Sequence, residues 1–285
     1  MDKRMIGLIA VRSEAGALLK SINIETTTTH IQARFHRGRL AGRPVILAEV
    51  GPGKAQTAAV TQHLIDRYEV ELMISCGSAG ALVSWLQAGD VILAETIALH
   101  DAGLHFKGGF HHLGLYDHAH PDGLHYRRRL AADPALLAAA HQTALNLAWP
   151  DRSPQIKIGG LVSGDQVIAD DLKKQWLRDT FNALAVEMEA GAMAQIAFLN
   201  DVPWLAVRAV SDNADSTLDF GFLNFITYTD EANKVMARLR QTARQATVIA
   251  QKPGRLKAAL KFRQALQYAA ANAARVTAAI ITQLA

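Results

Sequence analysis

Short apolar segments rich in β-branched residues alternate with segments of helical period over most of the chain, and this alternation restricts the fold more than any other feature. It predicts a mixed β-sheet covered by helices, which is an α/β fold. A single domain accounts for it, because no repeat or low-complexity linker interrupts the alternation before Thr247. We expect strands at residues 5–11, 44–50, 71–76, 90–99, 156–162, 183–186 and 203–210, and helices at residues 54–68, 134–147, 170–179 and 190–200.

The composition is that of an ordered globular protein: 50% of the 285 residues are hydrophobic, which is enough to fill a core. No signal peptide and no apolar run of roughly 20 residues is evident, so we expect a cytoplasmic protein with no integral membrane contact. The single cysteine, Cys76, excludes an internal disulfide and fits a reducing compartment. The formal charge of +4 comes from scattered basic residues, which argues against a nucleic-acid partner.

After a main domain of residues 1–250 we expect a helical extension at residues 251–285. Apolar residues such as Phe262, Leu266 and Ile280 recur there with helical period on one face and predict an amphipathic helix. Two interpretations stay open, namely attachment to a membrane surface or partner, and packing on its own domain or on a second subunit. Packing is favoured, because the apolar side is mostly alanine and lacks the bulky residues of interfacial helices.

Several polar segments follow predicted strands, where open α/β sheets bind their ligands. The segment Gly77-Ser78-Ala79-Gly80 follows the strand that ends near Cys76. Its glycines would let backbone N–H groups and the Ser78 hydroxyl approach an anion or a sugar oxygen. A tight glycine turn without a ligand is the alternative.

Two glutamates, Glu187 and Glu189, stand two positions apart at the end of another predicted strand, among apolar neighbours. A solvated edge is the simpler interpretation of such a pair. A buried carboxylate that binds ribose hydroxyls is the alternative, because a buried carboxylate needs hydrogen-bond partners.

Two more acids stand near strand ends. Asp212 ends an apolar strand, where it either protonates a leaving base or caps a turn together with Ser211. Glu14 lies just past the first strand, where it either serves as general base for a water or complements the dipole of a helix capped by Ser13.

Together these segments resemble the purine nucleoside phosphorylase and nucleosidase superfamily, and most closely the methylthioadenosine/S-adenosylhomocysteine nucleosidases. The resemblance covers about residues 5–250 and implies a single domain around a mixed, partly closed central sheet flanked by helices. It is carried by six motifs in the family's order: Gly51-Pro52-Gly53-Lys54, Cys76-Gly77-Ser78-Ala79-Gly80-Ala81, Gln87-Ala88-Gly89-Asp90, Val162-Ser163-Gly164-Asp165, Val186-Glu187-Met188-Glu189-Ala190 and Arg208-Ala209-Val210-Ser211-Asp212.

Carried over by position, the resemblance implies that Asp212 protonates N7 of adenine while Glu14 activates the attacking water. It also implies that Glu189 holds the ribose 2′ and 3′ hydroxyls, that Met188 packs beside the sugar and that Ser78 lies near the sugar and the water. An acid at the base and carboxylates at the sugar stabilise the charges that develop as the bond breaks, without a metal or other cofactor.

The resemblance assigns further contacts to the base and the 5′ group. Ser211 and Arg208 would support the acid, the backbone at Ile168 would read the base edge, and Phe222 falls where relatives pack the 5′-thioalkyl group. The family usually has an aromatic residue that stacks on the purine where this chain has Val167. Pro52 replaces a longer apolar residue near the 5′ pocket.

Hydrolysis is favoured over phosphorolysis, because phosphorylase relatives carry an arginine where this chain has Ser75, although Arg12 lies near the start of the site. A futalosine-type hydrolase, a phosphorylase, and a nucleoside-binding protein without turnover are the alternatives.

Seven of the 11 histidines lie between His100 and His125. A metal site or a pH-sensitive loop is one interpretation, but the spacing matches no zinc pattern and a solvated loop is favoured. The equivalent loop in the family borders the active site of a second subunit, so the resemblance implies a homodimer.

Overall fold

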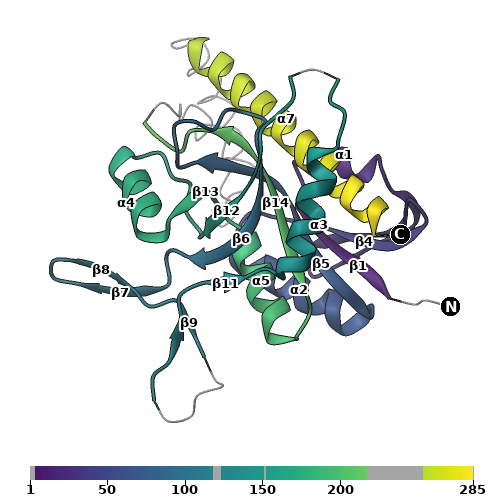
Figure 1. The fold of residues 1–285 in the computed structure, drawn as a ribbon, viewed down its shortest axis with the longest axis horizontal. Coiled ribbons are helices and arrows are strands. Elements are labelled where there is room, and N and C mark those ends of the chain that lie inside the picture. The colour runs from purple at the N-terminus through teal and green to yellow at the C-terminus, as the bar shows by residue number, and fades with distance from the viewer. Residues whose placement is uncertain (1–3, 118–122, 151, 217–252, 285) are drawn as a thin grey trace, which may run out of the picture.

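The computed structural model describes residues 4–117, 123–150, 152–216 and 253–284 (Figure 1). Its centre is a 10-stranded mixed sheet in the order β11-β6-β12-β13-β5-β1-β4-β3-β2, with β14 paired to both β5 and β6. The α/β class with a mixed sheet is therefore confirmed. The strands of this sheet are β1 (Met5–Val11), β2 (Asn23–His30), β3 (Ala33–Leu40), β4 (Arg43–Val50), β5 (Val70–Ala81), β6 (Val91–Leu99), β11 (Leu130–Ala131), β12 (Ile156–Ser163), β13 (Ala183–Glu187) and β14 (Trp204–Asp212).

Strand β14 closes part of the sheet on itself. It runs parallel to β5 and antiparallel to β6, and β6 connects back to β5 through β12 and β13. These strands form a ring, while β1, β4, β3 and β2 continue from β5 as an open sheet. The ring brings the end of β13 and the end of β14 to the same part of β5, because Gly80 pairs with both Val186 and Asp212.

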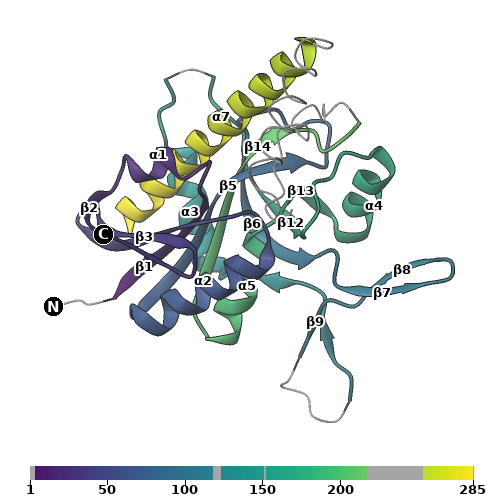
Figure 2. The ribbon, with the colours of Figure 1, turned by 180° about the vertical axis from the view of Figure 1, so that it is seen from behind.

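The open and closed parts are covered by α1 (Gly16–Leu19), α2 (Lys54–Arg67), α3 (Pro134–Leu145), α4 (Asp171–Phe181), α5 (Ala190–Leu199) and α7 (Pro253–Gln283). Successive side chains of a strand point to opposite faces, so the sheet fills a separate core on each side. In β4, Ile46 and Ala48 belong to the core shared with α2 and α5, whereas Val45 and Leu47 belong to the core shared with α1, α3 and α7. Figure 2 shows α2 and α5 side by side and α7 crossing the sheet diagonally.

Helix α7 packs on its own chain, which is the interpretation that the alanine-rich face favours. Ala269, Ala273 and Ile280 are buried against β5, β14, α1 and α3. The small alanine side chains let the helix approach the strands closely, and the Asn272 side chain donates a hydrogen bond to the Gly89 carbonyl at 2.9 Å. No helix within the described ranges is long and apolar enough to cross a bilayer.

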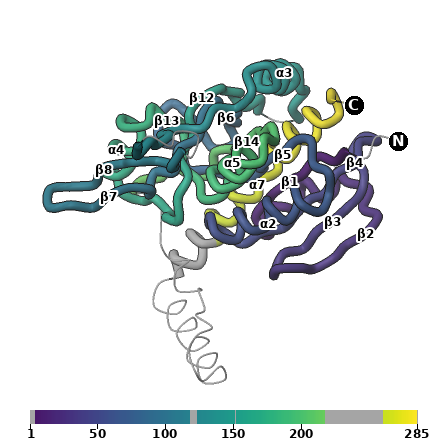
Figure 3. The backbone as a smooth tube through the Cα atoms, turned by 90° about the horizontal axis from the view of Figure 1, so that it is seen from below, coloured from purple at the N-terminus to yellow at the C-terminus, as the bar shows by residue number. Residues whose placement is uncertain are grey.

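The histidine-rich stretch forms short strands that project from the sheet (Figures 1 and 3). Strands β7 (Gly103–Phe106) and β8 (Gly109–His112) make one hairpin, and β9 (Leu115–Tyr116) pairs with β10 (Tyr126–Arg127). The tube in Figure 3 places the β7–β8 hairpin at the opposite end of the molecule from the hairpin of β2 and β3. His118 and His120 lie outside the described residues.

Candidate functional site

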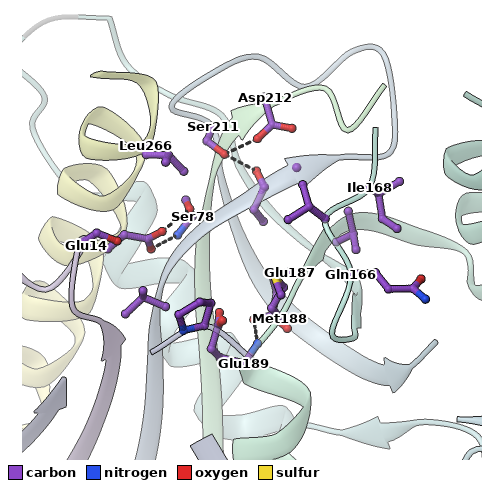
Figure 4. A pocket seen from close by; sticks show the side chains of 17 residues that line it. Glu14, Ser78, Gln166, Ile168, Glu187, Met188, Glu189, Ser211, Asp212 and Leu266 are labelled. Carbon is purple, nitrogen blue, oxygen red and sulfur yellow. Dashed lines mark hydrogen bonds between the residues drawn. The ribbon is translucent and has the colours of Figure 1, made fainter. Parts of the chain in front are cut away.

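A cavity of about 250 Å³ opens where the ring of strands meets the end of β1, the loop after β4 and helix α7 (Figure 4). Strand ends, loops and one helix all contribute to its wall, which is the arrangement expected of a ligand site in an α/β fold. The residues that line it are Val11, Ser13, Glu14, Pro52, Ser78, Ala79, Gly80, Gln166, Val167, Ile168, Val186, Glu187, Met188, Glu189, Ser211, Asp212 and Leu266.

Glu14 is anchored on β5. One carboxylate oxygen accepts the Ser78 backbone N–H at 2.8 Å and the other accepts the Ser78 hydroxyl at 2.7 Å (Figure 4). Helix α1 begins two residues later with Ala15 at its N-cap and no side-chain cap, so the alternative in which Ser13 caps that helix is wrong. Both Glu14 oxygens retain free lone pairs, so the carboxylate can accept a further proton or hydrogen bond from a ligand or water.

The segment Gly77-Ser78-Ala79-Gly80 is not a tight turn, so that alternative is wrong. Strand β5 continues through it to Ala81, paired with β14 on one side and, at its end, with β13 on the other. The strand pairing outweighs the weak strand propensity of glycine. The segment still reaches the cavity, because Ser78 and Gly80 line it.

Asp212 lies at the end of β14 and caps a turn there, which is one of the two roles that the sequence left open. Its Oδ1 accepts the Ala214 backbone N–H at 2.9 Å, as in a turn cap, and its Oδ2 accepts the Ser211 hydroxyl at 2.7 Å. The two bonds fix the orientation of a carboxyl group that lines the cavity (Figure 4). Ser211 therefore supports Asp212, as predicted.

Among the described residues, Arg208 forms its hydrogen bonds and ion pairs with Ser75, Glu187 and Glu189, so its predicted support of Asp212 has no direct bond behind it and stays a prediction. Residues four apart on a regular strand share a face but lie roughly 13 Å apart along it. Strand β14 also shifts its register between Val210 and Asp212. The side chains of Arg208 and Asp212 are therefore not expected to meet. The Arg208 side chain is buried with 1% exposure and its Nη2 donates to Glu187 Oε2 at 2.5 Å and to the Ser75 hydroxyl at 2.8 Å. It lies behind the cavity and does not line it.

Both glutamates of the Glu187–Glu189 pair are buried, with 5% exposure each, so the solvated-edge interpretation is wrong. Glu187 Oε2 also accepts the backbone N–H groups of Glu189 at 2.9 Å and Ala190 at 2.7 Å, at the start of α5. Glu189 Oε2 is 3.7 Å from Arg208 Nη2 and Glu189 Oε1 accepts the Gly53 backbone N–H at 3.0 Å. Both glutamates line the cavity; Oε2 of Glu187 is occupied by hydrogen bonds from the protein, whereas its buried Oε1 has no hydrogen-bond partner among the described residues.

Burial raises the pKa of Glu189 to about 7, and the negative charge of Glu187 adds to this shift. Arg208 and the Gly53 N–H act in the opposite direction, because both stabilise the carboxylate. A group that titrates near neutral pH inside a cavity is typical of a functional site.

The remaining wall comes from a loop and from α7. Gln166, Val167 and Ile168 follow β12, and the Val167 side chain is 54% exposed. Leu266 of α7 also lines the cavity, although the sequence prediction placed Phe222 there (Figure 4). Phe222 lies outside the described residues. The helical period of residues 262–280 was the only sequence signal for Leu266, and it indicated burial without indicating a cavity.

Two residues bear on phosphate binding. Ser75, where phosphorylases carry arginine, is fully buried and accepts a hydrogen bond from Arg208. The Arg12 side chain is 66% exposed, and its Nε lies 3.8 Å from the buried carboxylate of Glu49. Neither residue lines the cavity.

The described histidines form no cluster of three metal-ligating side chains within the described ranges. Burial lowers the pKa of His100 to about 4, so its ring is neutral at physiological pH. His112 is also buried, and its Nε2 is 2.9 Å from the Leu99 carbonyl oxygen.

Glu189→Gln should make the protein more stable at alkaline pH. The folded protein holds the Glu189 proton more tightly than the unfolded chain, since the pKa is about 7 instead of 4.5. The native free energy of unfolding therefore falls as the pH rises through this window. We expect the variant to exceed the native protein by on the order of 2 kcal/mol above the window and to match it below. Urea unfolding below, within and above the window measures this difference, and a pH-independent difference would contradict it.

Comparison with known proteins identifies relatives of the whole site region. Residues 6–250 match the Phosphorylase superfamily. The 5′-methylthioadenosine/S-adenosylhomocysteine nucleosidase of Staphylococcus saprophyticus is 34% identical over 226 residues, which cover 78% of this chain and 92% of the relative. The nucleosidase of the same name from Anoxybacillus flavithermus is 31% identical over 227 residues, which cover 79% of this chain and 91% of the relative.

Solved structures share the fold over nearly the entire chain. The Neisseria meningitidis nucleosidase, in complex with methylthio-immucillin-A, superposes with a TM-score of 0.72 at 26% identity, covering 99% of each chain. The futalosine hydrolase of Helicobacter pylori superposes with a TM-score of 0.73 at 23% identity, covering 99% of this chain and 98% of its own, and shows the common fold alone. The chain therefore belongs to the Phosphorylase superfamily and, within it, to the family of 5′-methylthioadenosine/S-adenosylhomocysteine nucleosidases.

Proposed function

We propose that the protein hydrolyses the N-glycosidic bond of methylthioadenosine and S-adenosylhomocysteine, giving adenine and the 5′-substituted ribose. The observation that carries the proposal is the convergence of Glu14, Glu189 and Asp212 on one cavity. The names of the two curated relatives support this choice of substrates.

Asp212 is the proposed general acid. Cleavage leaves negative charge on the departing purine, and a proton delivered to N7 neutralises it. The Ser211 hydroxyl and the Ala214 N–H hold the Asp212 carboxyl group in one orientation. Because the group is already oriented, less conformational entropy is lost when the proton is transferred to the base.

Glu14 is the proposed general base. Ser78 fixes both of its oxygens, and the remaining lone pairs orient a water and accept its proton as the water attacks the anomeric carbon. The Glu14 carboxylate also stabilises the positive charge that develops on the ribose.

Glu189 is the proposed ribose ligand. In its ionised form it accepts hydrogen bonds from the 2′ and 3′ hydroxyls, and Met188 packs beside the sugar. Its position next to the Gly53 N–H leaves Oε2 directed toward the Arg208 side, where the buried guanidinium limits the cost of the charge.

The apolar wall formed by Val11, Pro52 and Leu266 is the proposed contact for the 5′ substituent. A methylthio group is apolar and gains free energy when such a wall removes it from water. Leu266 joins this proposed contact, and the role predicted for Phe222 stays a prediction.

Release of adenine from methylthioadenosine, S-adenosylhomocysteine and adenosine, each with and without phosphate, tests the proposal. Phosphate-independent release with free 5′-substituted ribose supports hydrolysis, and the buried Ser75 and the paired Arg12 favour this result. Strict dependence on phosphate would make the protein a phosphorylase. Binding without release from any nucleoside, futalosine included, would make it a binding protein.

Asp212→Asn should lower kcat by about 100-fold or more, because it removes the proton donor at nearly constant volume. The assay is adenine release, with the melting temperature as a check of folding. Asp133→Asn is the matched control, since the Asp133 side chain caps α3 through the Leu136 N–H and does not line the cavity. Native turnover in Asp212→Asn would remove Asp212 from the proposed mechanism.

Val167→Phe should lower KM for methylthioadenosine by about tenfold. A ring at this half-exposed position can stack on the purine, and such stacking contributes roughly 1–3 kcal/mol. Val167→Leu, which adds apolar bulk without a ring, should change KM much less. Equal KM values for the two variants would show that the purine does not lie on residue 167.

We also propose that the protein is a homodimer in solution. The projecting strands expose apolar side chains, with Leu104 57%, Phe106 56% and Leu124 81% accessible. Apolar groups gathered on such a projection are typical of an interface. Sedimentation should give a dimer for the native protein and a monomer for Phe106→Asp. Ile31→Asp, which changes an exposed residue at the distant β2–β3 turn, should remain dimeric.

A further inference from the structure

Lys54 joins three loops at the edge of the cavity. It is the first residue of α2, and its ammonium nitrogen lies 2.6 Å from Asp101 Oδ1 and 3.9 Å from Asp165 Oδ2. Asp101 follows β6 and Asp165 follows β12. The lysine side chain is 24% exposed and that of Asp101 is 16% exposed, so this ion pair is partly shielded from water.

Backbone hydrogen bonds close the same group into a triangle. The Lys54 N–H donates to Asp165 Oδ1 at 2.7 Å, and the Asp165 N–H donates to Asp101 Oδ2 at 3.0 Å. Each of the three residues therefore contacts the other two. We call this group the Lys54–Asp101–Asp165 latch.

Gly53 connects the latch to Glu189, the proposed ribose ligand. This residue precedes Lys54, has a φ of +108°, and donates its N–H to Glu189 Oε1 at 3.0 Å. A Cβ atom at Gly53 would lie only 3.0 Å from Asp165 Oδ1, so the glycine is pressed against the latch. The neighbours Pro52 and Gln166 both line the cavity. Movement of the latch would therefore move the donor that Glu189 depends on.

The ion pair persists at neutral pH. Burial alone would raise the pKa of Asp101, but the hydrogen bonds from Lys54 and from the Asp165 N–H outweigh it and lower the pKa. Breaking the pair by removing the cation would leave two carboxylates facing each other at the rim, which favours separation of the loops.

We propose that the Lys54–Asp101–Asp165 latch is a positioning device that holds the Gly53 N–H on Glu189 and thereby fixes the Glu189 carboxyl group for the ribose hydroxyls. None of its three side chains lines the cavity, so it acts through Glu189 and the loops. The proposal rests on the proposed function, since it assigns the ribose to Glu189.

A structural role alone would have a different signature. Asp165 also caps the first turn of α2, whose N-cap Gly53 has no side chain, so loss of the latch lowers stability in either case. Only the positioning role changes the titration of Glu189. The Gly53 N–H lowers the pKa of Glu189, and its withdrawal therefore raises that pKa. The other groups that act on Glu189, namely Glu187, Arg208 and Glu14, stay in place when Lys54 is replaced.

Lys54→Met and Lys54→Arg are compared with the native enzyme by measuring kcat and KM for methylthioadenosine over the pH range in which Glu189 titrates. For Lys54→Met we expect KM to rise about five- to tenfold, as for the loss of one hydrogen bond of ordinary strength, with a smaller change in kcat. The pH midpoint of 1/KM should move upward. Lys54→Arg retains the cation and should restore both values to near native.

Arg43→Met is the matched control. The Arg43–Glu71 pair, at 2.6 Å and with 26% and 25% exposure, resembles the Lys54 pair but joins β4 and β5 at the ends remote from the cavity. The control should lose stability without any movement of the pH midpoint. A midpoint in Lys54→Met that stays native, whatever its stability, overturns the proposal.

Two further measurements separate this proposal from the proposed function. The pH dependence of the free energy of unfolding reports the pKa of Glu189 without turnover, and it should shift upward in Lys54→Met relative to native protein. If native protein releases no adenine, the proposed function fails while this shift still tests the latch. Asp101→Asn removes the same ion pair from the other side and should reproduce the shift if Lys54→Met does not fold.

Discussion

The site depends on the buried ion pair between the Arg208 guanidinium and Glu187. A charge with 1% exposure must be paired, because an uncompensated buried charge costs several kcal/mol. Glu187 compensates it, and through its other hydrogen bonds Glu187 also fixes the start of α5. The same charge explains Gly77 in the middle of β5, since a Cβ there would collide with the Arg208 guanidinium and with the Glu14 carboxylate. One arginine thus lies next to acids from two separate segments, namely Glu14 after β1 and the Glu187–Glu189 pair at the end of β13.

The three glutamates Glu14, Glu187 and Glu189 accept different hydrogen bonds from the protein, and these differences support the roles proposed for them. The three hydrogen bonds of Glu187, from a guanidinium and two backbone amides, all fall on Oε2, whereas its buried Oε1 has no hydrogen-bond partner among the described residues. Glu14 is fixed by Ser78 but keeps free lone pairs, which suits a base that must receive a proton. Burial and the negative charge of Glu187 raise the pKa of Glu189, and Arg208 and the Gly53 N–H offset this shift only in part.

The sequence predicted the buried part of this fold well and the rest poorly. The strands and helices that carry the site follow from apolar periodicity, because burial on one or both faces produces that pattern. Strands β2 and β3 were both missed. All residues of β2 are exposed, and β2 is paired with β3 alone among the described strands. The glycines of residues 77–80 left a tight turn open as an alternative. The structure replaces it with a strand, because the close approach of Arg208 and the pairing of β5 involve segments that are distant in the sequence. The contacts of Leu266 and the latch depend on distant segments in the same way, and no local pattern encodes them.

The raised pKa of Glu189 connects stability to binding. Burial and the negative charge of Glu187 favour the neutral form of the Glu189 carboxyl group. The folded protein therefore loses stability as the pH rises and Glu189 ionises. Ribose hydroxyls would supply the hydrogen bonds that this carboxylate lacks, so part of the binding free energy comes from relief of that cost. The Gly53 N–H limits the cost in the empty enzyme by partly satisfying the same oxygen. Weakening or withdrawal of the Gly53 N–H would favour the protonated form of Glu189. If Glu189 binds the ribose as proposed, the geometry of Lys54, the first residue of α2, contributes to the free energy of nucleoside binding.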